Sequence, residues 1–345
     1  MKILILLLLG ICSQASAYSN SQSSTPSNMQ LGETTKLKSI LSMNDIFLQS
    51  QFRTGEPSYG ILDNPQWRLG LESRFAQWID IEGSFGSNQF LYRPRWSFTP
   101  TESVNLIDLK GTLHTLIGDI YVGQFRIPWG LWGSIDEEQL WLPRNLLFEK
   151  GYFLLRDVGV GFHTNFEGYY MNLAAHNGEG AGLSNYDNRM FVTGQWGYQG
   201  PANIDFGVGA TAGRLGIPVA TTETQIRGAN AYFGFNIFGL GLQIEGSVIE
   251  THNETGNIDT VAWHADAQHP VSDRINLITR YEQLNPNSKT AANVLGRGYL
   301  GGEFHSRDNI SRLFVYIIKN NESLIETPND EFRIIWRITP PIIDM

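Results

Sequence analysis

The sequence contains one cysteine, Cys12, in 345 residues. It follows an apolar run from Ile3 to Ile11 and precedes Ala15-Ser16-Ala17, which has the small-residue pattern of a signal-peptide cleavage site. The run is too short for a membrane helix, which needs roughly 20 residues. We therefore expect residues 1–17 to be a secretory signal peptide, cleaved near Ala17, and the remaining chain to form no disulfide. Lipidation of Cys12 is the alternative, and the bulk of the preceding isoleucine disfavours it.

Long apolar runs are absent after residue 17, so no transmembrane helix is expected. Charged residues are scarce, at 17% of the chain, and the net charge of −9 disfavours nucleic-acid binding. Glycine (36 residues) and aromatic residues (12%) are abundant instead. A chain of this length fits one or two soluble domains or one large closed sheet, and this composition favours the sheet.

Residues 18–43 are rich in serine, threonine, asparagine and glutamine, with few large apolar side chains. Such a segment cannot bury enough surface to offset the entropy of ordering it. We interpret it as a flexible periplasmic spacer, with docking to the cell wall as the alternative. Residues 44–345 are expected to form the folded domain.

Within this domain, apolar residues alternate with polar residues or glycine, a period typical of strands with one apolar and one polar face. Clear examples lie at 203–210, 240–248 and 261–268. The pattern predicts about 16 strands, within a range of 12 to 18, centred near residues 49, 70, 82, 94, 108, 120, 159, 173, 192, 207, 231, 245, 263, 279, 300 and 314, with a last strand at 331–338. This tally exceeds an even number by one, so either 90–97 or 104–112 is not a separate strand.

Both a soluble β-sandwich and a membrane β-barrel produce this alternation, whereas propellers and solenoids need repeats that the sequence lacks. Segments of about ten residues match tilted membrane strands. The polar faces carry charges such as Arg68 and Asp80, which a water-filled lumen accepts. Aromatic residues such as Trp78 and Trp196 lie near strand ends, as in an interfacial girdle. The sequence therefore predicts an all-β fold, a transmembrane antiparallel β-barrel.

One interval between strands is unusually long. The sequence leaves the strand pattern at Pro128 and Gly130 and returns to it at Arg156. Loops of this length in a compact fold are usually functional. We expect residues 127–152 to fold into the lumen as a constriction loop. Its tryptophans, Trp129, Trp132 and Trp141, fit two roles: anchoring the loop to the barrel wall, which we favour, or a sliding surface for sugars.

Three segments around this interval resemble the phosphate-selective porin O/P family. Residues 122–131 (VGQFRIPWGL) resemble the family's V-G-Q-F-K-x-P-F-G segment, 154–160 (LLRDVGV) resemble its R-D-x-G-V strand, and 169–180 (YYMNLAAHNGEG) resemble the strand and turn that follow. The resemblance covers about sixty residues. It implies a sixteen-stranded, homotrimeric outer-membrane porin whose third external loop folds inward.

Charged residues in and beside the loop are the candidate constriction site. The predicted basic side consists of Arg126, Arg144, Lys150 and Arg156, and the predicted acidic side consists of Asp136, Glu137, Glu138 and Glu149. A phosphate pathway needs a continuous run of cationic donors, which an acidic loop does not offer. The resemblance therefore does not carry the family's phosphate selectivity to this chain.

The sequence offers little for catalysis or metal binding. It has no G-x-S-x-G motif and no H-E-x-x-H motif. His264 and Asp266 share one strand face, but a zinc site needs more ligands. We expect no cofactor and no metal. The predicted function is an outer-membrane porin for small anions or other small hydrophilic solutes. The alternatives are an occluded barrel with a structural or adhesive role and, ranked lower, an outer-membrane enzyme.

Overall fold

The computed structural model describes residues 40–42, 68–75, 78–87, 105–135, 139–183, 185, 187–201, 204–216, 223–253, 256–290, 293–307, 310–324 and 330–338. The predicted signal peptide, residues 18–39 of the predicted spacer, and the strands expected near residues 49 and 94 lie outside the described residues. Every other predicted strand has a counterpart in the structure.

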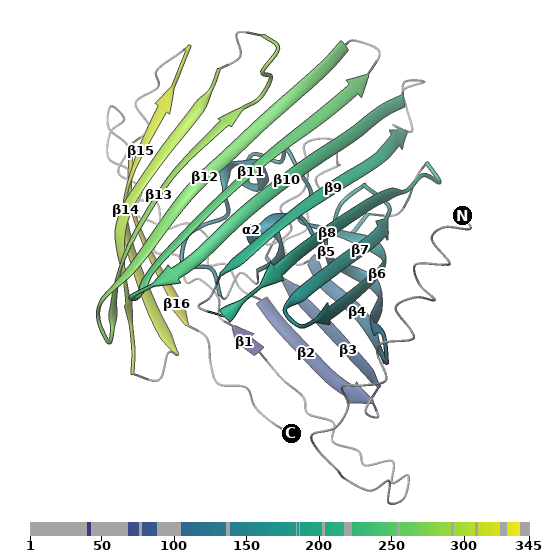
Figure 1. The fold of residues 1–345 in the computed structure, drawn as a ribbon, viewed down its shortest axis with the longest axis horizontal. Helices are drawn as coiled ribbons and strands as arrows, with labels where there is room; N and C mark the ends of the chain where they lie inside the picture. Colours follow the sequence, from purple (N-terminus) through teal and green to yellow (C-terminus); the bar gives the residue numbers. More distant parts are fainter. Residues whose placement is uncertain are drawn as a thin grey trace, which may run out of the picture.

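The described strands form one antiparallel sheet in which neighbours in sequence are neighbours in space, from β1 to β16 (Figure 1). This confirms the predicted all-β fold of about 16 strands. The strands are β1 (Ile40–Ser42), β2 (Arg68–Phe75), β3 (Ile79–Gly86), β4 (Asn105–Thr115), β5 (Gly118–Arg126), β6 (Arg156–Phe166), β7 (Tyr169–His176), β8 (Phe191–Gln199), β9 (Asp205–Gly216), β10 (Glu223–Ile237), β11 (Leu240–Asn253), β12 (Gly256–Ser272), β13 (Ile275–Asn285), β14 (Leu295–His305), β15 (Ser311–Glu322) and β16 (Glu331–Ile338).

The first strand begins earlier than the sequence pattern indicates. β1 starts at Ile40 and pairs with β2, whereas the pattern predicts the folded domain from residue 44. Three residues are too few to display a period of two, so this strand has no signature of its own in the sequence.

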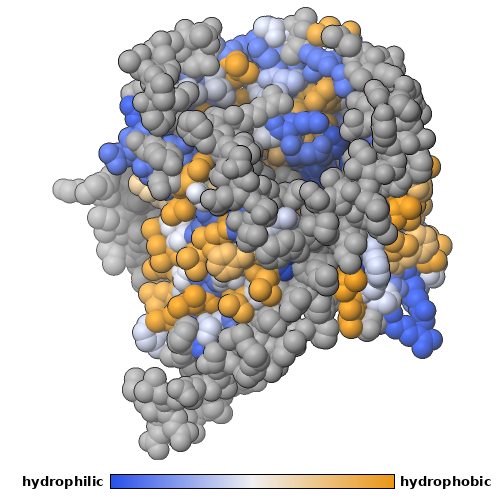
Figure 2. Space-filling view, turned by 180° about the vertical axis from the view of Figure 1, so that it is seen from behind, coloured by the Kyte–Doolittle hydropathy of each residue, from blue (hydrophilic) through white to orange (hydrophobic). Residues whose placement is uncertain are grey.

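The two faces of the sheet have opposite character. Leu300, at the centre of β14, is 55% exposed on the outer face, and its neighbour Tyr299 is buried on the inner face. Apolar side chains gather on the outer surface in Figure 2. Charged side chains such as Glu245 and Arg280 are buried on the inner face. A soluble sandwich has the reverse arrangement, so the fold is a transmembrane β-barrel whose apolar face contacts lipid.

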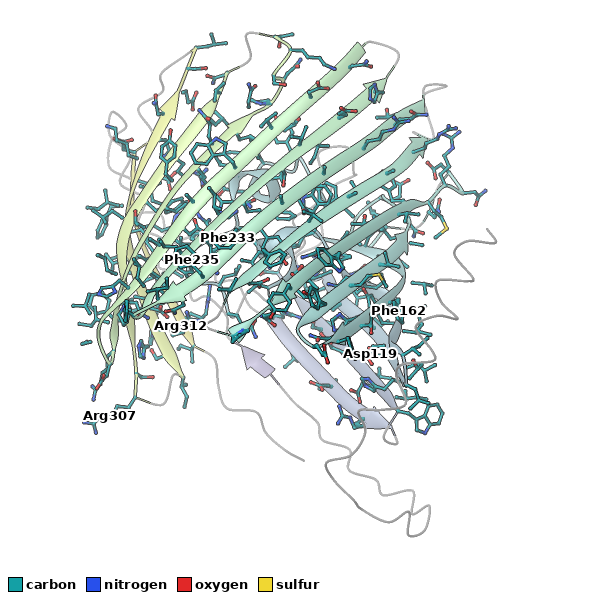
Figure 3. All side chains as sticks on the ribbon, viewed as in Figure 1. Asp119, Phe162, Phe233, Phe235, Arg307 and Arg312 are labelled. Carbon is teal, nitrogen blue, oxygen red and sulfur yellow. The ribbon has the colours of Figure 1, made fainter. Side chains whose placement is uncertain are left out.

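Aromatic rings gather on the outer face near one end of the strands. Tyr169 on β7 stacks on Trp196 on β8, with ring centroids 5.9 Å apart. On β10, Phe233 and Phe235 lie close to the turn into β11 (Figure 3), with centroids 5.6 Å apart. This arrangement is the aromatic girdle that the sequence predicts for a membrane interface.

The two ends of the sheet differ in their connections. At the end that carries the girdle, several connections are two-residue turns, at 116–117, 167–168, 238–239 and 273–274. At the opposite end most connections are longer, apart from residues 254–255 between β11 and β12, and the connection between β5 and β6 spans residues 127–155. It contains α2 (Gly130–Ser134) and α3 (Leu146–Glu149). Among the described residues, no helix has the length and apolar character needed to cross a membrane.

Candidate functional site

The β5–β6 connection, which we call the inner loop (residues 127–155), crosses the interior of the barrel. Its helix α2 meets the far wall at Glu245 on β11. The carboxylate of Glu245 accepts hydrogen bonds from the backbone N–H groups of Leu131 and Trp132, at 3.0 and 3.1 Å. These N–H groups lie in the first turn of α2 and have no partner within the helix, and a buried carboxylate stabilises them by charge-assisted bonding.

The second helix, α3, is bound to the wall in the same way. Glu282 on β13 accepts a hydrogen bond from the backbone N–H of Leu146 at 2.9 Å. At the other end of α3, Glu149 forms a two-bond ion pair with Arg297 on β14, at 2.6 and 2.9 Å. Burial alone would raise the pKa of Glu149, but the adjacent Arg297 guanidinium lowers it to about 2. The pair therefore stays ionised at neutral pH.

Between the two helices, wall side chains donate to loop carbonyl groups. Arg280 on β13 donates to Pro143 O at 2.6 Å, Tyr316 on β15 donates to Trp141 O at 2.7 Å, and Arg337 on β16 donates to Leu140 O at 2.7 Å. Arg280 is itself held by Asp266 through two bonds of 2.6 and 3.0 Å. The inner loop is thus fixed along strands β11 to β16.

Apolar packing fills the remaining space on this side of the lumen. Trp129 and Trp132 have no exposed surface. Trp129 stacks on Phe153 with centroids 4.4 Å apart, and the guanidinium of Arg280 lies 4.1 Å from the ring centroid of Trp132. Two apolar clusters join loop residues to strands β5, β7, β8 and β10 to β16. Trp129 and Trp132 therefore anchor the loop to the wall, as the favoured interpretation predicts, and offer no surface to a passing sugar, whereas Trp141 is half-buried.

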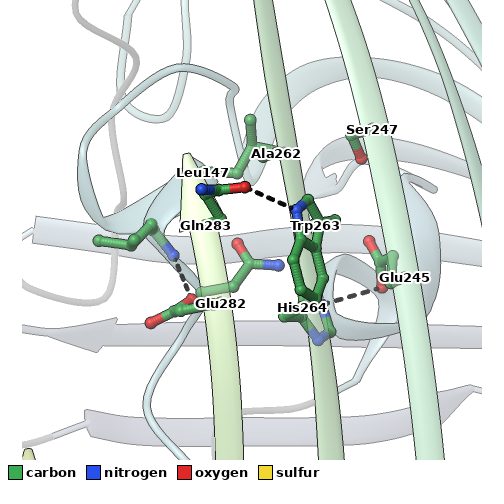
Figure 4. Close-up of a pocket in the computed structure, with 10 residues that line it drawn as sticks. Leu147, Glu245, Ser247, Ala262, Trp263, His264, Glu282 and Gln283 are labelled. Atoms are coloured by element: carbon green, nitrogen blue, oxygen red, sulfur yellow. Dashed lines mark hydrogen bonds and ion pairs between the residues drawn. The ribbon is translucent and has the colours of Figure 1, made fainter. Parts of the chain in front are cut away.

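A small cavity of about 10 Å³ lies where α3 meets strands β11 to β13 (Figure 4). That volume holds about one water molecule. His264 lies at its edge, 3.8 Å from Glu245 and 3.3 Å from Asp266. In the described part of the chain, no three histidine, cysteine, aspartate or glutamate side chains converge as a metal site would require. His264 lies between the carboxylates of Glu245, which binds the inner loop, and Asp266, which binds Arg280.

A larger cavity, of about 300 Å³, lies on the other side of the inner loop, toward strands β3 to β7. Its lining includes Glu82, Lys110, Asn172 and Arg126 from the wall and Ser134 from the loop. Lys110 and Glu82 form an ion pair of 3.0 Å across β3 and β4. The inner loop therefore divides the lumen into a filled side and a side with a polar hollow.

Two arginines converge on one carboxylate at the edge of this cavity. Asp108 accepts from Arg68 at 2.7 Å and from Arg156 at 3.0 Å. Arg156 has no exposed surface, and Asp108 also lines the cavity. One carboxylate is thus shared by two guanidinium groups.

The structure separates the predicted constriction residues. Arg126 lines the large cavity, and Arg156 lies at its edge. Arg144 is buried and donates to Ile135 O within the loop, at 2.6 Å. Glu149 pairs with the wall, and Lys150 lies 3.7 Å from Glu149. The remaining three acidic residues, Asp136, Glu137 and Glu138, lie outside the described residues.

Sequence reasoning did not assign most of the cavity lining to the site; Asp108 and Gln124 were missed, and so were four further polar residues. Glu82, Lys110 and Asn172 lie on strands, and Ser134 lies in α2. For the strand residues a signal exists, because each occupies an inward position of its alternating segment. For Ser134 no pattern in the sequence distinguishes it from other loop serines.

One hydrogen-bonded chain has the order of a catalytic triad. His176 contacts Asp157 through Nδ1 at 2.8 Å and Thr193 Oγ1 through Nε2 at 2.9 Å. All three side chains have no exposed surface, and the Thr193 hydroxyl is also paired with Thr211 at 2.8 Å. Neither of the two cavities described above is lined by these residues. A substrate cannot reach the hydroxyl, so the chain ties β6 to β9 together on the inner face.

Comparison with known proteins agrees with this fold. No family model and no curated protein matches the sequence. In-vitro folded OmpT from Vibrio cholerae, an outer membrane protein in its trimer form, superposes with a TM-score of 0.60 at 11% identity, covering 86% of this chain and 97% of that one. An anion-selective porin from Comamonas acidovorans gives 0.58 at 12% identity, covering 79% and 88%.

The outer membrane channel DcaP of Acinetobacter baumannii gives a TM-score of 0.61 at 9% identity, covering 88% of this chain and 96% of that one. At such identities the likeness concerns the fold. The chain has the fold of these outer-membrane β-barrel proteins.

Proposed function

We propose that this protein is an outer-membrane porin through which small hydrophilic solutes diffuse. The observation that carries the proposal is the asymmetric position of the inner loop, which is held by hydrogen bonds to strands β11 to β16 and leaves a polar cavity of about 300 Å³ lined by residues of β3, β4, β5 and β7. If the loop only filled the lumen to stabilise the barrel, we would expect no polar cavity with charged walls beside it. The passage then runs between Ser134 on the loop and Asn172 on the wall.

The charges at the cavity favour small anions. Lys110 and Arg126 line it together with Glu82 and Asp108, and Asp108 is already shared by Arg68 and Arg156. The lining thus holds two basic and two acidic residues, and the side chains next to it add Arg68 and Arg156 beside Asp108 and Glu72 opposite Glu82, which makes four basic groups to three acidic ones. Fixed charges at a narrow passage bias which ions pass. We therefore propose anion preference, without extending it to phosphate.

A pair of serine-to-cysteine variants tests the position of the passage. The only natural cysteine is Cys12, within the predicted signal peptide, so an introduced thiol would be unique in the processed chain. Ser134→Cys places a thiol on the exposed side of the loop, and Ser247→Cys places one on the filled side, where Ser247 is buried. In planar bilayers, a charged thiol reagent should reduce the conductance of Ser134→Cys strongly and leave Ser247→Cys unchanged.

Two outcomes would contradict the proposal. Reconstituted protein without single-channel conductance would rule out a pore, and block at Ser247→Cys with none at Ser134→Cys would move the passage to the other side. The first outcome would support the second candidate, an occluded structural or adhesive barrel. The two apolar clusters that fill half the lumen favour that candidate. Deleting residues 131–150 should then raise conductance from zero.

Location and assembly follow from the same proposal. We infer a position in the outer membrane of a Gram-negative cell, with the short turns on the periplasmic side. Assembly as a homotrimer is proposed by analogy with the trimer form of OmpT. We propose no enzymatic activity, because the one Asp–His–Thr chain in the described residues is inaccessible.

A further inference from the structure

A second segment, residues 177–183 between β7 and β8, also folds inward beside the cavity. Its sequence is Asn-Gly-Glu-Gly-Ala-Gly-Leu, and its three glycines all have positive φ, of 87°, 95° and 72°. These left-handed positions coil the segment tightly, and L-residues rarely adopt them. Residues 178–183 are buried apart from Gly182. We call 177–183 the second inner segment.

Hydrogen bonds attach this segment to the site. The backbone N–H of Gly182 donates to Gln124 Oε1 at 2.6 Å, and Gln124 lines the large cavity. The N–H of Gly178 donates to Asp157, and the N–H of Asn177 donates to Val158 O at 3.0 Å. The second inner segment therefore holds a side chain of the cavity wall, Gln124, without lining the cavity itself.

Glu179, at the centre of this segment, is an acidic residue in a buried position. Its side chain is only 8% exposed, and its Oε1 atom is fully buried with no hydrogen-bond partner among the described residues. The charged groups that act on it are carboxylates: Asp187 in the same connection and Asp157 on β6, which is bonded to His176 on β7. Burial, with these two carboxylates, raises the pKa of Glu179 from 4.5 to about 7.

We propose that Glu179 is a proton-binding site that controls whether the second inner segment stays docked against Gln124 in the cavity wall. With a proton bound, Glu179 is neutral and fits its buried position. Once ionised, it would be a buried, unpaired anion beside two others, which is strongly unfavourable. Release of the segment then removes the Gly182 bond from Gln124 and leaves this side chain of the cavity wall free to move, which changes the cross-section of the proposed passage.

The direction of the pH effect follows from the raised pKa. The docked state binds its proton more tightly than the released state does. Docking is therefore fully stable below about pH 4.5, weakens as the pH rises toward 7, and changes no further above that. The closed form is the acidic form. The effect on conductance rests on the proposed porin function, whereas the docking equilibrium does not.

Conductance gives the first test. In planar bilayers, wild-type conductance should rise between pH 4.5 and pH 7. Glu179→Gln, which is permanently neutral and nearly isosteric, should stay at the acidic value throughout. Glu167→Gln makes the same charge change in the exposed β6–β7 turn and should behave as wild type. Equal pH profiles for Glu179→Gln and wild type would overturn the proposal.

Thiol labelling gives a second test that needs no pore. Leu183→Cys puts a smaller side chain at a buried position of the segment, and Leu116→Cys supplies a fully exposed reference in the β4–β5 turn. Dividing one labelling rate by the other removes the pH dependence of the thiol itself. The ratio should rise from pH 4.5 to pH 7, and Glu179→Gln should abolish the rise. A flat ratio would refute the proposal, whereas a rising ratio in a non-conducting barrel would refute only the pore.

Discussion

In the proposed passage, the charge of Lys110 should affect ion selectivity most directly. Lys110 lies on β4, lines the large cavity and forms a 3.0 Å ion pair with Glu82. Both side chains are about one third exposed, so each remains in contact with water. The pair contributes little to stability at such exposure. Its importance lies in the field that it creates for a passing ion.

Replacing Lys110 should therefore change selectivity more than folding. In Lys110→Gln, Glu82 loses its counter-charge and the passage loses one cation. A unit charge about 5 Å from an ion in water is worth about 0.8 kcal/mol, which is about fourfold for an anion and about fourfold in the opposite direction for a cation, so the anion-to-cation permeability ratio should fall about 16-fold. The reversal potential under a salt gradient measures this. Lys319→Gln removes a lysine that is 78% exposed at the side chain and does not line the cavity, and it should leave the potential unchanged.

Gly130 shows how one residue permits the loop to dock. Its φ is +66°, and a Cβ atom there would overlap the carboxylate of Glu245, the same group that binds the first turn of α2. Both the positive φ and the close approach of Glu245 require glycine at this position. Gly130→Ala should weaken docking by about 1–3 kcal/mol from backbone strain, with the overlap adding to it.

Single-channel recordings of Gly130→Ala should show larger and more variable conductance than wild type. Gly111→Ala is the matched control, because a Cβ atom at Gly111 meets nothing within 4 Å and its φ is not positive. An unchanged, quiet conductance in Gly130→Ala would show that the contact with Glu245 does not fix the loop.

At the scale of elements, the inner loop was predictable in its existence but not in its attachment. A break in the two-residue period at Pro128 and Gly130 and its return at Arg156 locate the loop in the sequence. Its partners on the wall are remote: Glu245 binds Trp132 across 113 positions, and Arg337 binds Leu140 across 197. A single sequence carries no local pattern for such contacts. For this reason Arg144 and Glu149, assigned to the passage by charge alone, are found in contacts that hold the loop.

At the scale of the whole molecule, the fold was more predictable from the sequence, because every strand of a barrel repeats the same alternation of inward and outward side chains. The period of two locates the strands and sorts each into two faces. It cannot say which face meets lipid, since a soluble sandwich obeys the same period. Strand length, charged inner positions and the aromatic girdle decided between them, and exposed Leu300 beside buried Tyr299 agrees with that choice.

This inside-out arrangement predicts opposite responses to the same substitution on the two faces. Leu300→Arg places a charge at the centre of β14 on the outer face, where lipid offers it no hydrogen-bond partner, and should destabilise the folded barrel by about 2–4 kcal/mol. Thr112→Arg puts the same side chain on the inner face of β4, where water solvates it. Urea unfolding from lipid vesicles compares the two. Equal destabilisation would mean that the outer face does not contact lipid, and the barrel would then have to be a soluble fold with an exposed apolar surface.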